Sequence, residues 1–209
     1  MKQLLLDIQP PAPPTLANFI VGRNAEALHN LQQLMAGKAE ARFIYLWGEH
    51  GSGKSHLLQA CQQLAGQSLR TVVCVDDVQL LSDAEQIALF NTYNDLRGGE
   101  GSLLVTGTAA PMQMGLRDDL ATRLAWGLSY QLQPLSDEEK ALALKNHAQA
   151  RGMKLPDEVL EYCLRHLRRD MPTLIATLDA LDDWSLSYKR PVTLPLLREL
   201  IQLPPKRQI

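Results

Sequence analysis

Cysteine is scarce in this sequence, and its distribution excludes a disulfide-stapled fold. The three cysteines, Cys61, Cys74 and Cys163, are odd in number, far apart in the chain, and each lies within an apolar periodic segment. Such cysteines are typical of reduced thiols in the core of a cytosolic protein. The five histidines include no pair at helical spacing beside a carboxylate, so a metal site built from histidine and cysteine has little support.

The sequence also lacks an excess of basic charge and a long apolar run. Its 21 Lys and Arg residues face 23 Asp and Glu residues, a formal charge of −2 with a pI of about 6.2. No global positive field attracts nucleic acid, which disfavours direct DNA binding. The apolar run at the N-terminus is far too short for a signal peptide or a membrane span. We therefore expect a cytoplasmic protein without a membrane segment.

What the sequence does contain is a complete phosphate-binding loop. The pattern G-x-x-x-x-G-K-S/T is met by Gly48-Glu49-His50-Gly51-Ser52-Gly53-Lys54-Ser55, between an apolar segment, 43–47, and an amphipathic one, 57–64. This strand–turn–helix context is the one that the motif requires. Backbone N–H groups would surround the phosphates, Lys54 would reach the β- and γ-phosphates, and Ser55 would hold Mg²⁺. The motif predicts a bound nucleotide with Mg²⁺; the plain alternative is an accidental glycine turn.

The pattern of apolar and polar residues predicts where strands, helices and domain boundaries lie. With 209 residues and 45% hydrophobic content, it is long enough for a medium-sized domain and a small one. Apolar strands alternate with amphipathic helices up to residue 133, which predicts a parallel sheet with right-handed crossovers. The expected strands are 43–47, 69–75, 103–106 and 128–132, the last of them at an edge. We expect a peptide and proline-rich linker over 1–14, a nucleotide-binding domain over 15–133 and a helical subdomain over 134–209.

Two carboxylates follow the second expected strand. A metal-dependent nucleotide site needs such groups opposite the phosphate loop, so we expect Asp76 to hold Mg²⁺ through water and Asp77 to polarise the attacking water. Thr106 and Thr108 lie at the end of the next strand, where a hydroxyl could touch the γ-phosphate. The plain alternatives are an Asp-Asp turn and ordinary turn hydroxyls.

Two arginines are candidates for nucleotide contacts. Arg123 precedes the last expected strand and, if exposed, could enter a neighbouring subunit's nucleotide site as an arginine finger. Arg169 lies at the start of the third helix of the helical part, where it could fold back on the bound nucleotide. The alternatives are a surface salt bridge from Arg123 to Asp119 and, for Arg169, a solvated charge in a basic cluster.

The order of these motifs resembles the AAA+ module of the DnaA replication initiator family. The resemblance covers residues 19–203 and rests on the phosphate loop, Asp76-Asp77-Val78-Gln79, Thr106-Gly107-Thr108, Leu124-Ala125-Trp126-Gly127-Leu128 and Arg169-Asp170-Met171. It implies an α/β fold, a P-loop AAA+ parallel sheet with a small all-α C-terminal lid. The initiator continues into a DNA-binding domain whereas this chain stops at Ile209, so we expect one of the family's regulatory inactivators.

The family resemblance gives a meaning to the N-terminal leucines. In this family a short peptide of the type Q-L-x-L-x-L docks into the hydrophobic groove of the DNA polymerase sliding clamp. The segment Gln3-Leu4-Leu5-Leu6-Asp7-Ile8 matches it and precedes a stiff proline spacer. The resemblance therefore implies clamp contacts by Gln3, Leu4, Leu6 and Ile8. A leucine-rich tail packed on its own domain is the alternative.

The sequence departs from the family pattern at three points. Thr108 stands where relatives commonly have Asp, which leaves its sensor role open. Asp77 replaces the longer Glu of many AAA+ proteins, which implies slow independent turnover. Between Lys54 and Asp76 there is room for one helix and one strand, whereas the AAA+ layout has a further strand and helix there. We therefore expect a sheet that lacks one strand–helix unit.

The resemblance implies a function that acts on another protein. The chain would be a nucleotide-bound regulatory inactivator, tethered to the sliding clamp, that presents Arg123 to ATP held by DnaA and so prevents re-initiation of replication. Its own nucleotide, ADP as the resemblance implies, would contact Lys54, Ser55, Asp76 and Arg169. One alternative is a self-contained P-loop ATPase or kinase with fast turnover. Another is a DNA-binding initiator or loader, with a steeply salt-dependent duplex affinity. The sequence does not determine the oligomeric state, and it is compatible with a homo-oligomer.

Overall fold

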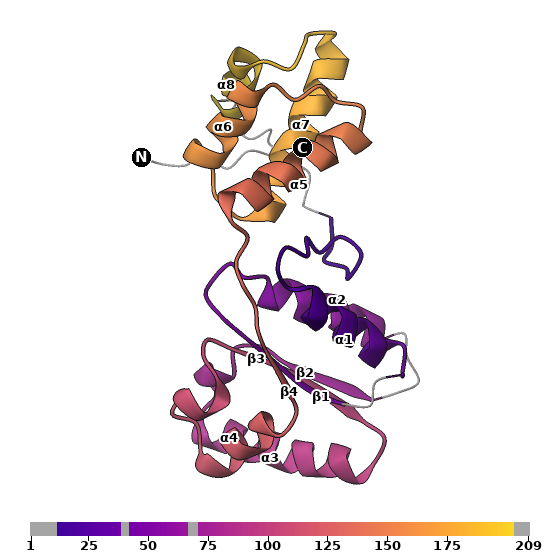
Figure 1. The fold of residues 1–209 in the computed structure, drawn as a ribbon, viewed down its shortest axis with the longest axis vertical. Helices are drawn as coiled ribbons and strands as arrows, with labels where there is room; N and C mark the ends of the chain where they lie inside the picture. Colours follow the sequence, from indigo (N-terminus) through magenta and orange to yellow (C-terminus); the bar gives the residue numbers. More distant parts are fainter. Residues whose placement is uncertain (1–11, 39–41, 67–70, 203–209) are drawn as a thin grey trace, which may run out of the picture. The chain divides into compact units, whose positions relative to one another are not determined.

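The computed structural model describes residues 12–38, 42–66 and 71–202. The expected clamp peptide, including Gln3, Leu4, Leu6 and Ile8, lies outside these residues. The described chain forms two compact units, one over Pro13–Leu135 and one from Ser136 onward (Figure 1). Each unit has its own hydrophobic core, so each is described by itself.

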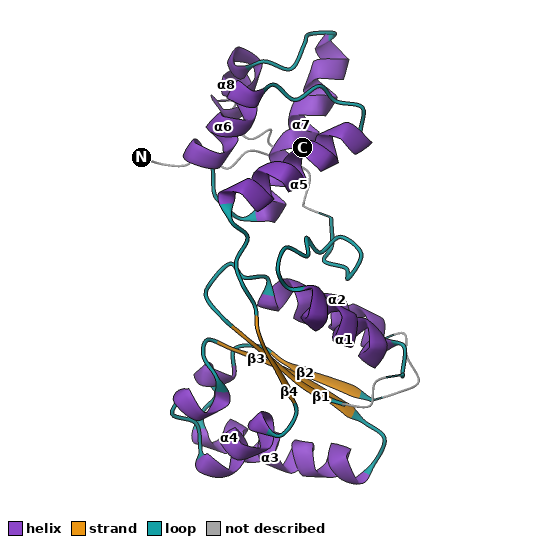
Figure 2. Cartoon of the chain, in the orientation of Figure 1, coloured by secondary structure: helices purple, strands orange, loops and turns teal. Residues whose placement is uncertain are grey.

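The first unit is a parallel sheet between two layers of helices (Figure 2). Its four strands lie in the order β2-β3-β1-β4, and all three pairings are parallel. The elements are α1 Ala25–Met35, β1 Phe43–Trp47, α2 Lys54–Ala65, β2 Val72–Val75, α3 Asp83–Gly98, β3 Ser102–Gly107, α4 Asp118–Ala125 and β4 Leu128–Gln131. The predicted parallel sheet of four strands, with β4 at one edge, is confirmed.

Both faces of the sheet are apolar because both are covered by helices. Successive strand residues point to opposite faces. On one face Ile44 and Leu46 of β1 join the core formed with α1 and α2, while on the other Tyr45 and Val105 join the core formed with α3 and α4. Parallel strands buried on both faces read as continuous apolar runs, which is why the sequence pattern identified them.

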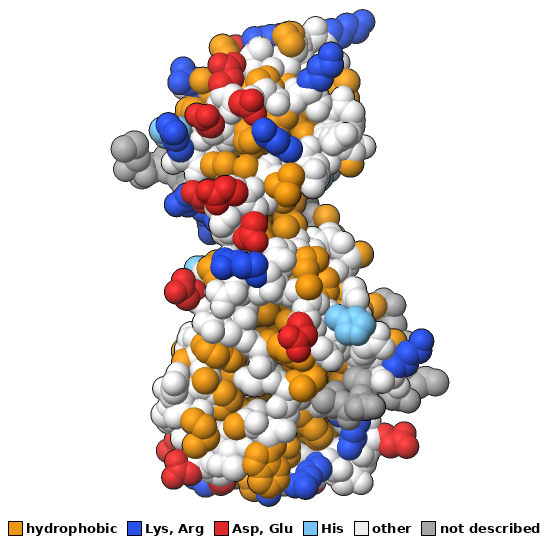
Figure 3. All heavy atoms as spheres, in the orientation of Figure 1, with side chains coloured by type: hydrophobic (Ala, Val, Ile, Leu, Met, Phe, Trp, Pro, Cys, Tyr) orange, Lys and Arg blue, Asp and Glu red, His pale blue; other side chains and the backbone are white. Residues whose placement is uncertain are grey.

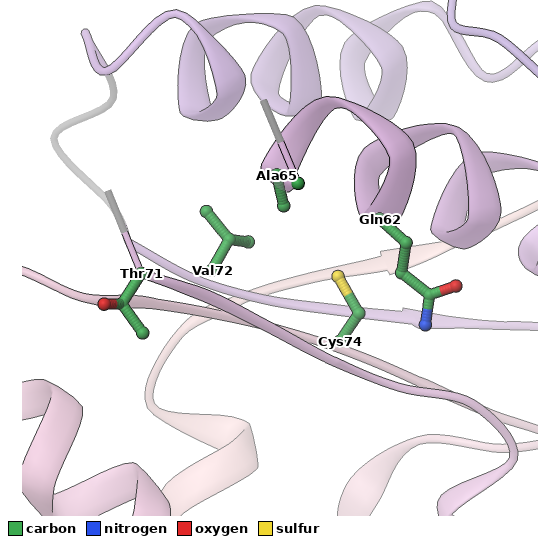
Figure 4. A pocket seen from close by; sticks show the side chains of 6 residues that line it. Gln62, Ala65, Thr71, Val72 and Cys74 are labelled. Carbon is green, nitrogen blue, oxygen red and sulfur yellow. The ribbon is translucent and has the colours of Figure 1, made fainter. Parts of the chain in front are cut away.

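Strand β2 is an open edge among the described residues. Its four residues are half-buried, whereas every residue of the central strand β3 is buried. A shallow hollow of about 440 Å³ lies between β2 and the C-terminal end of α2. Figure 4 shows Gln62 and Ala65 on the helix side of it and Thr71, Val72 and Cys74 on the strand side. The expected missing unit corresponds to this edge, since β2 pairs with β3 alone in the described sheet.

Local sequence signals set the helix boundaries. Helix α3 begins after Ser82, whose hydroxyl accepts a hydrogen bond from the backbone N–H of Glu85, while the Glu85 carboxylate accepts one from the backbone N–H of Ser82. This capping box satisfies two N–H groups that lack helical partners. The same device begins the first helix of the second unit, with Ser136 and Glu139. Both predicted capping boxes are confirmed.

The second unit is entirely helical. It consists of α5 Asp137–Ala150, α6 Asp157–His166, α7 Met171–Tyr188 and α8 Leu194–Gln202. Leu144, Leu160, Leu178 and Leu197 come from the four helices in turn and are all buried in one core. At the C-cap of α5, Arg151 donates a hydrogen bond of 3.0 Å to Asp182 and so links α5 to α7. Throughout the described chain, no helix combines the length and the apolar character that a bilayer crossing requires.

Candidate nucleotide-binding site and arginine surface

The phosphate loop joins β1 to α2 through glycines in left-handed backbone conformations. The φ angles of Gly48, Gly51 and Gly53 are +145°, +80° and +96°. A Cβ at Gly48 would lie 2.4 Å from the carbonyl oxygen of Leu132, just after β4. Only glycine meets both conditions at Gly48, the backbone conformation and the close approach. The loop geometry therefore follows from the glycine spacing and puts Lys54 at the first position of α2.

Lys54 lies inside the loop that precedes it. Its Nζ donates hydrogen bonds of 2.8 Å to the carbonyl oxygen of Gly48 and 2.9 Å to that of Glu49. Burial lowers the pKa of Lys54, and the carboxylates of Asp77 and Asp76 act in the opposite direction. A buried ammonium group gains from an anionic partner. The loop thus holds a positive charge where a phosphate group would meet it.

The two carboxylates lie at the same edge of the sheet as the loop. Because β2 and β3 pair with Val75 opposite Val105, Asp76 and Thr106 follow at neighbouring positions. The Thr106 hydroxyl, which is fully buried, donates to Oδ1 of Asp76 and accepts a 2.9 Å hydrogen bond from the backbone N–H of Asp77. The carboxyl ends of parallel strands are the usual place for ligands in open α/β sheets. Lys54, Asp76 and Asp77 are brought together as expected.

Asp77 has a backbone conformation that few residues adopt. Its φ is +48°, in the left-handed region that Asp and Asn tolerate better than most. The side-chain amide of Gln79 donates a 2.9 Å hydrogen bond to Oδ1 of Asp77. Thr106 and Gln79 together fix the directions of the two carboxylates. No role for Gln79 follows from the sequence pattern, because its contact depends on the turn that the left-handed residue creates.

Thr108 is placed differently from Thr106. It is exposed, and its hydroxyl contacts the sulfur of Met114 at 3.6 Å. The hydroxyl that meets the carboxylates thus belongs to Thr106, two residues earlier. A contact between Thr108 and a nucleotide stays a prediction.

The chemistry of the loop fits a nucleotide with magnesium. Oγ of Ser52 is buried and has no hydrogen-bond partner in the described part of the chain, so the loop holds a polar group with unused capacity. The Ser55 hydroxyl and the Asp76 carboxylate are oxygen donors, which Mg²⁺ prefers, usually together with phosphate oxygens and waters. The described residues contain no group of three or more His, Cys, Asp or Glu side chains that could hold a metal. With two oxygen donors from the protein, magnesium would be held jointly with the phosphate oxygens of the nucleotide.

Arg123 lies on a surface of aromatic rings. Its guanidinium carbon is 4.3 Å from the ring centroid of Trp126, 5.8 Å from that of Phe90 and 6.0 Å from that of Tyr93. Trp126, at the C-cap of α4, is 59% exposed. The expected alternative, a salt bridge to Asp119, is not formed, because Asp119 pairs with Arg117 at 3.0 Å instead. Arg123 is half-buried. Its guanidinium group contacts aromatic rings and forms no ion pair with a described residue.

Arg169 belongs to the helical unit. It precedes Asp170, the N-cap of α7, and forms an ion pair with Asp137 at the start of α5. Both side chains are more than half exposed, so the pair contributes little to stability. A nucleotide contact by Arg169 stays a prediction. On the face shown in Figure 3, basic and acidic side chains are interspersed, as the balanced composition leads one to expect.

The fold is shared with known AAA+ structures. Domain III of the replication initiation protein DnaA from Thermotoga maritima matches with a TM-score of 0.67 and 23% identity, over 93% of this chain and 100% of that one. AMPPCP-bound DnaA from Aquifex aeolicus matches with a TM-score of 0.68 and 22% identity, over 83% of this chain and 66% of that one. A single-residue variant of RuvB from T. maritima matches with a TM-score of 0.63 and 17% identity, over 91% of this chain and 72% of that one. At such identities the likeness establishes the fold alone.

The sheet order, the phosphate loop and the helical unit define the class: a P-loop AAA+ module with a C-terminal lid. Residues 137–201, which run from α5 into α8, match the family model described as "Hda, lid domain". Residues 137–201 therefore form a lid of the Hda type. The predicted α/β fold with a helical lid is confirmed, and over residues 137–201 the Hda lid match agrees with the predicted family.

Proposed function

We propose that the chain is a regulatory inactivator of DnaA that stimulates hydrolysis of DnaA-bound ATP. The Hda-type lid supports a regulator of this kind. The observation that carries the mechanism is Arg123, which lies beside an exposed indole and forms no ion pair with any described residue. A guanidinium placed in this way can enter a partner's nucleotide site and stabilise the charge that develops during phosphoryl transfer. Hydrolysis would switch DnaA off and prevent re-initiation.

The chain's own nucleotide is part of the proposal. AMPPCP is bound in the DnaA structure from A. aeolicus, which has a similar fold, and the loop of this chain has the glycine conformations described above. ADP or ATP would contact the phosphate loop, with Lys54 on the phosphates, and magnesium would be held by Ser55 and Asp76. Arg169 and Thr108 would add further contacts to the nucleotide. Asp77, fixed by Gln79, would orient a water in any slow turnover at this site.

The function is tested by the nucleotide state of DnaA in a mixture of the full chain, ATP-loaded DnaA and clamp on DNA. DnaA is expected to change from its ATP form to its ADP form, while the chain alone turns over slowly. Fast ATP turnover by the chain alone, indifferent to DnaA and clamp, would identify a self-contained ATPase or kinase instead. Tight duplex binding without clamp would favour an initiator or loader.

Tethering to the sliding clamp provides a separate prediction. The double substitution of Leu4 and Leu6 with alanine is expected to weaken clamp binding about 100-fold, because two apolar anchors of an extended peptide are removed. Surface plasmon resonance on immobilised clamp measures the dissociation constant of each variant. Leu5→Ala is the matched control, since Leu5 lies between the two at a position that the pattern leaves free. Equal losses in both variants would show that the segment has another role.

A further inference from the structure

The aromatic surface around Arg123 carries a second arginine. The guanidinium carbon of Arg97 lies 5.3 Å from the ring centroid of Trp126, the ring that Arg123 contacts at 4.3 Å. Arg97 comes from the last turn of α3 and Arg123 from the last turn of α4. The ends of two successive α-helices thus bring two cations to one exposed indole.

The charges of these two arginines are not compensated by carboxylates. Neither forms an ion pair with any residue that the structure describes, and the nearest acidic residue on α4, Asp119, is engaged by Arg117. Two helix C-termini and one ring face stabilise the cations only partly. The site is therefore short of negative charge at a point where Trp126 is exposed.

Contact with an indole also restricts arginine motion. A free arginine side chain populates many rotamers, and holding it in one costs conformational entropy. Arg123 packed against Trp126 has already lost part of that freedom before any partner binds. A group aimed in advance at developing charge contributes more to catalysis than one that must be ordered during the reaction.

We propose that Trp126 is a positioning residue for Arg123 and that Arg97, on the same ring, is a second cation for the phosphate groups of the partner's nucleotide. The planar forks of two guanidiniums match phosphate oxygens, which a bound nucleoside triphosphate presents in several directions. Arg123 acts on the phosphate that is transferred, and Arg97 on charge that is present before and after the reaction. This inference rests on the proposed function of Arg123.

The two roles predict different kinetic effects with ATP-loaded DnaA and clamp. Trp126→Leu is expected to lower the maximal stimulated rate about tenfold, because the finger is no longer aimed. Trp126→Phe, which retains a ring face, is expected to recover most of that rate. Arg97→Gln is expected to raise the half-saturating concentration of the chain about five- to tenfold and leave the maximal rate unchanged, because it removes charge that attracts the bound phosphates in every state.

Matched controls come from the helical unit. Tyr188 is 60% exposed, similar to Trp126, and Arg198 lies 5.4 Å from the ring of Tyr162. Tyr188→Leu and Arg198→Gln are expected to leave both kinetic parameters within about twofold of wild type. Binding of ADP to the chain's own loop and the melting temperature, measured for each variant, show whether the fold is retained.

The outcomes separate this inference from the function on which it rests. A Trp126→Phe variant as slow as Trp126→Leu would show that the ring does not position Arg123. An Arg97→Gln variant with wild-type kinetics would remove Arg97 from the site. If Arg123→Ala abolishes stimulation while Trp126→Leu and Arg97→Gln have no effect, the inference alone is wrong. If Arg123→Ala itself stimulates normally, the proposed function fails and the inference with it.

Discussion

Replacing Arg123 with alanine is expected to slow the stimulated hydrolysis of DnaA-bound ATP by about 10³-fold or more, the range found for arginine fingers. The side chain is half-buried against Trp126 and makes no ion pair with a described residue, so its removal leaves the core of the first unit intact. The effect should appear in the single-turnover rate constant, since the finger acts on charge that develops in the transition state. Binding of the chain's own nucleotide should not change.

Two further substitutions check the assignment of Arg123. Arg123→Lys retains the charge but not the planar fork, and it is expected to recover only a small part of the rate. Arg117→Ala removes a neighbouring arginine that is already paired with Asp119, and it is expected to stimulate normally. Stimulation by Arg123→Ala at the wild-type rate would show that another group acts on the partner's ATP.

The second large effect is expected at Lys54. Lys54→Ala should weaken ADP binding roughly 100-fold, because a charge-assisted contact with phosphate contributes about 3 kcal/mol. The ammonium group is buried and is held by the carbonyl oxygens of Gly48 and Glu49, so it is already directed into the loop. Displacement of a fluorescent ADP analogue measures the affinity. Lys38→Ala removes an exposed lysine of the same unit and should bind ADP normally.

The pKa of Lys54 gives this binding a pH dependence. Burial lowers that pKa in the free protein, whereas a bound phosphate favours the charged form and raises it. Binding therefore takes up a proton once the pH exceeds the pKa of the free protein. ADP affinity is expected to fall as the pH rises through that value, and to become independent of pH in Lys54→Ala. An affinity that is unchanged at alkaline pH in wild type would contradict a role for Lys54 as the phosphate contact.

The parts of the fold that could be predicted depend on contacts between near neighbours in sequence. The glycine spacing determines the loop from Gly48 to Ser55, and the pairs Ser82–Glu85 and Ser136–Glu139 determine where two helices begin. The apolar strands are recognisable because helices cover both faces of the sheet. Such signals need no knowledge of how distant segments pair.

The parts that could not be predicted depend on register and on side-chain reach. Asp76 meets Thr106 rather than Thr108 because Val75 lies opposite Val105 in the sheet, and no sequence pattern fixes that register. The contact between Arg97 and Trp126 likewise requires the positions of two helix ends. Asp119 is an equally reasonable partner for Arg123 in the sequence, but Arg117 is engaged with it in the fold.

Under the proposed function, two sites of the first unit have different roles: one binds a nucleotide, and the other acts on the nucleotide of DnaA. The phosphate loop, with Lys54 held against its carbonyl oxygens, would bind a nucleotide, and Asp77, restrained by Gln79, would support only slow turnover there. Arg123 lies on the aromatic surface that α3 and α4 form, beside the exposed ring of Trp126. The bound nucleotide would then set the conformation of the chain, and the consequential hydrolysis would take place on DnaA.

The most direct test follows the phosphate that DnaA carries. DnaA is loaded with ATP labelled at the γ-phosphate, the chain with unlabelled ADP, and the two are mixed with clamp on DNA under single-turnover conditions. We expect labelled phosphate to be released at least about 10³-fold faster than from DnaA alone. Release of labelled phosphate at the rate of DnaA alone would contradict the account.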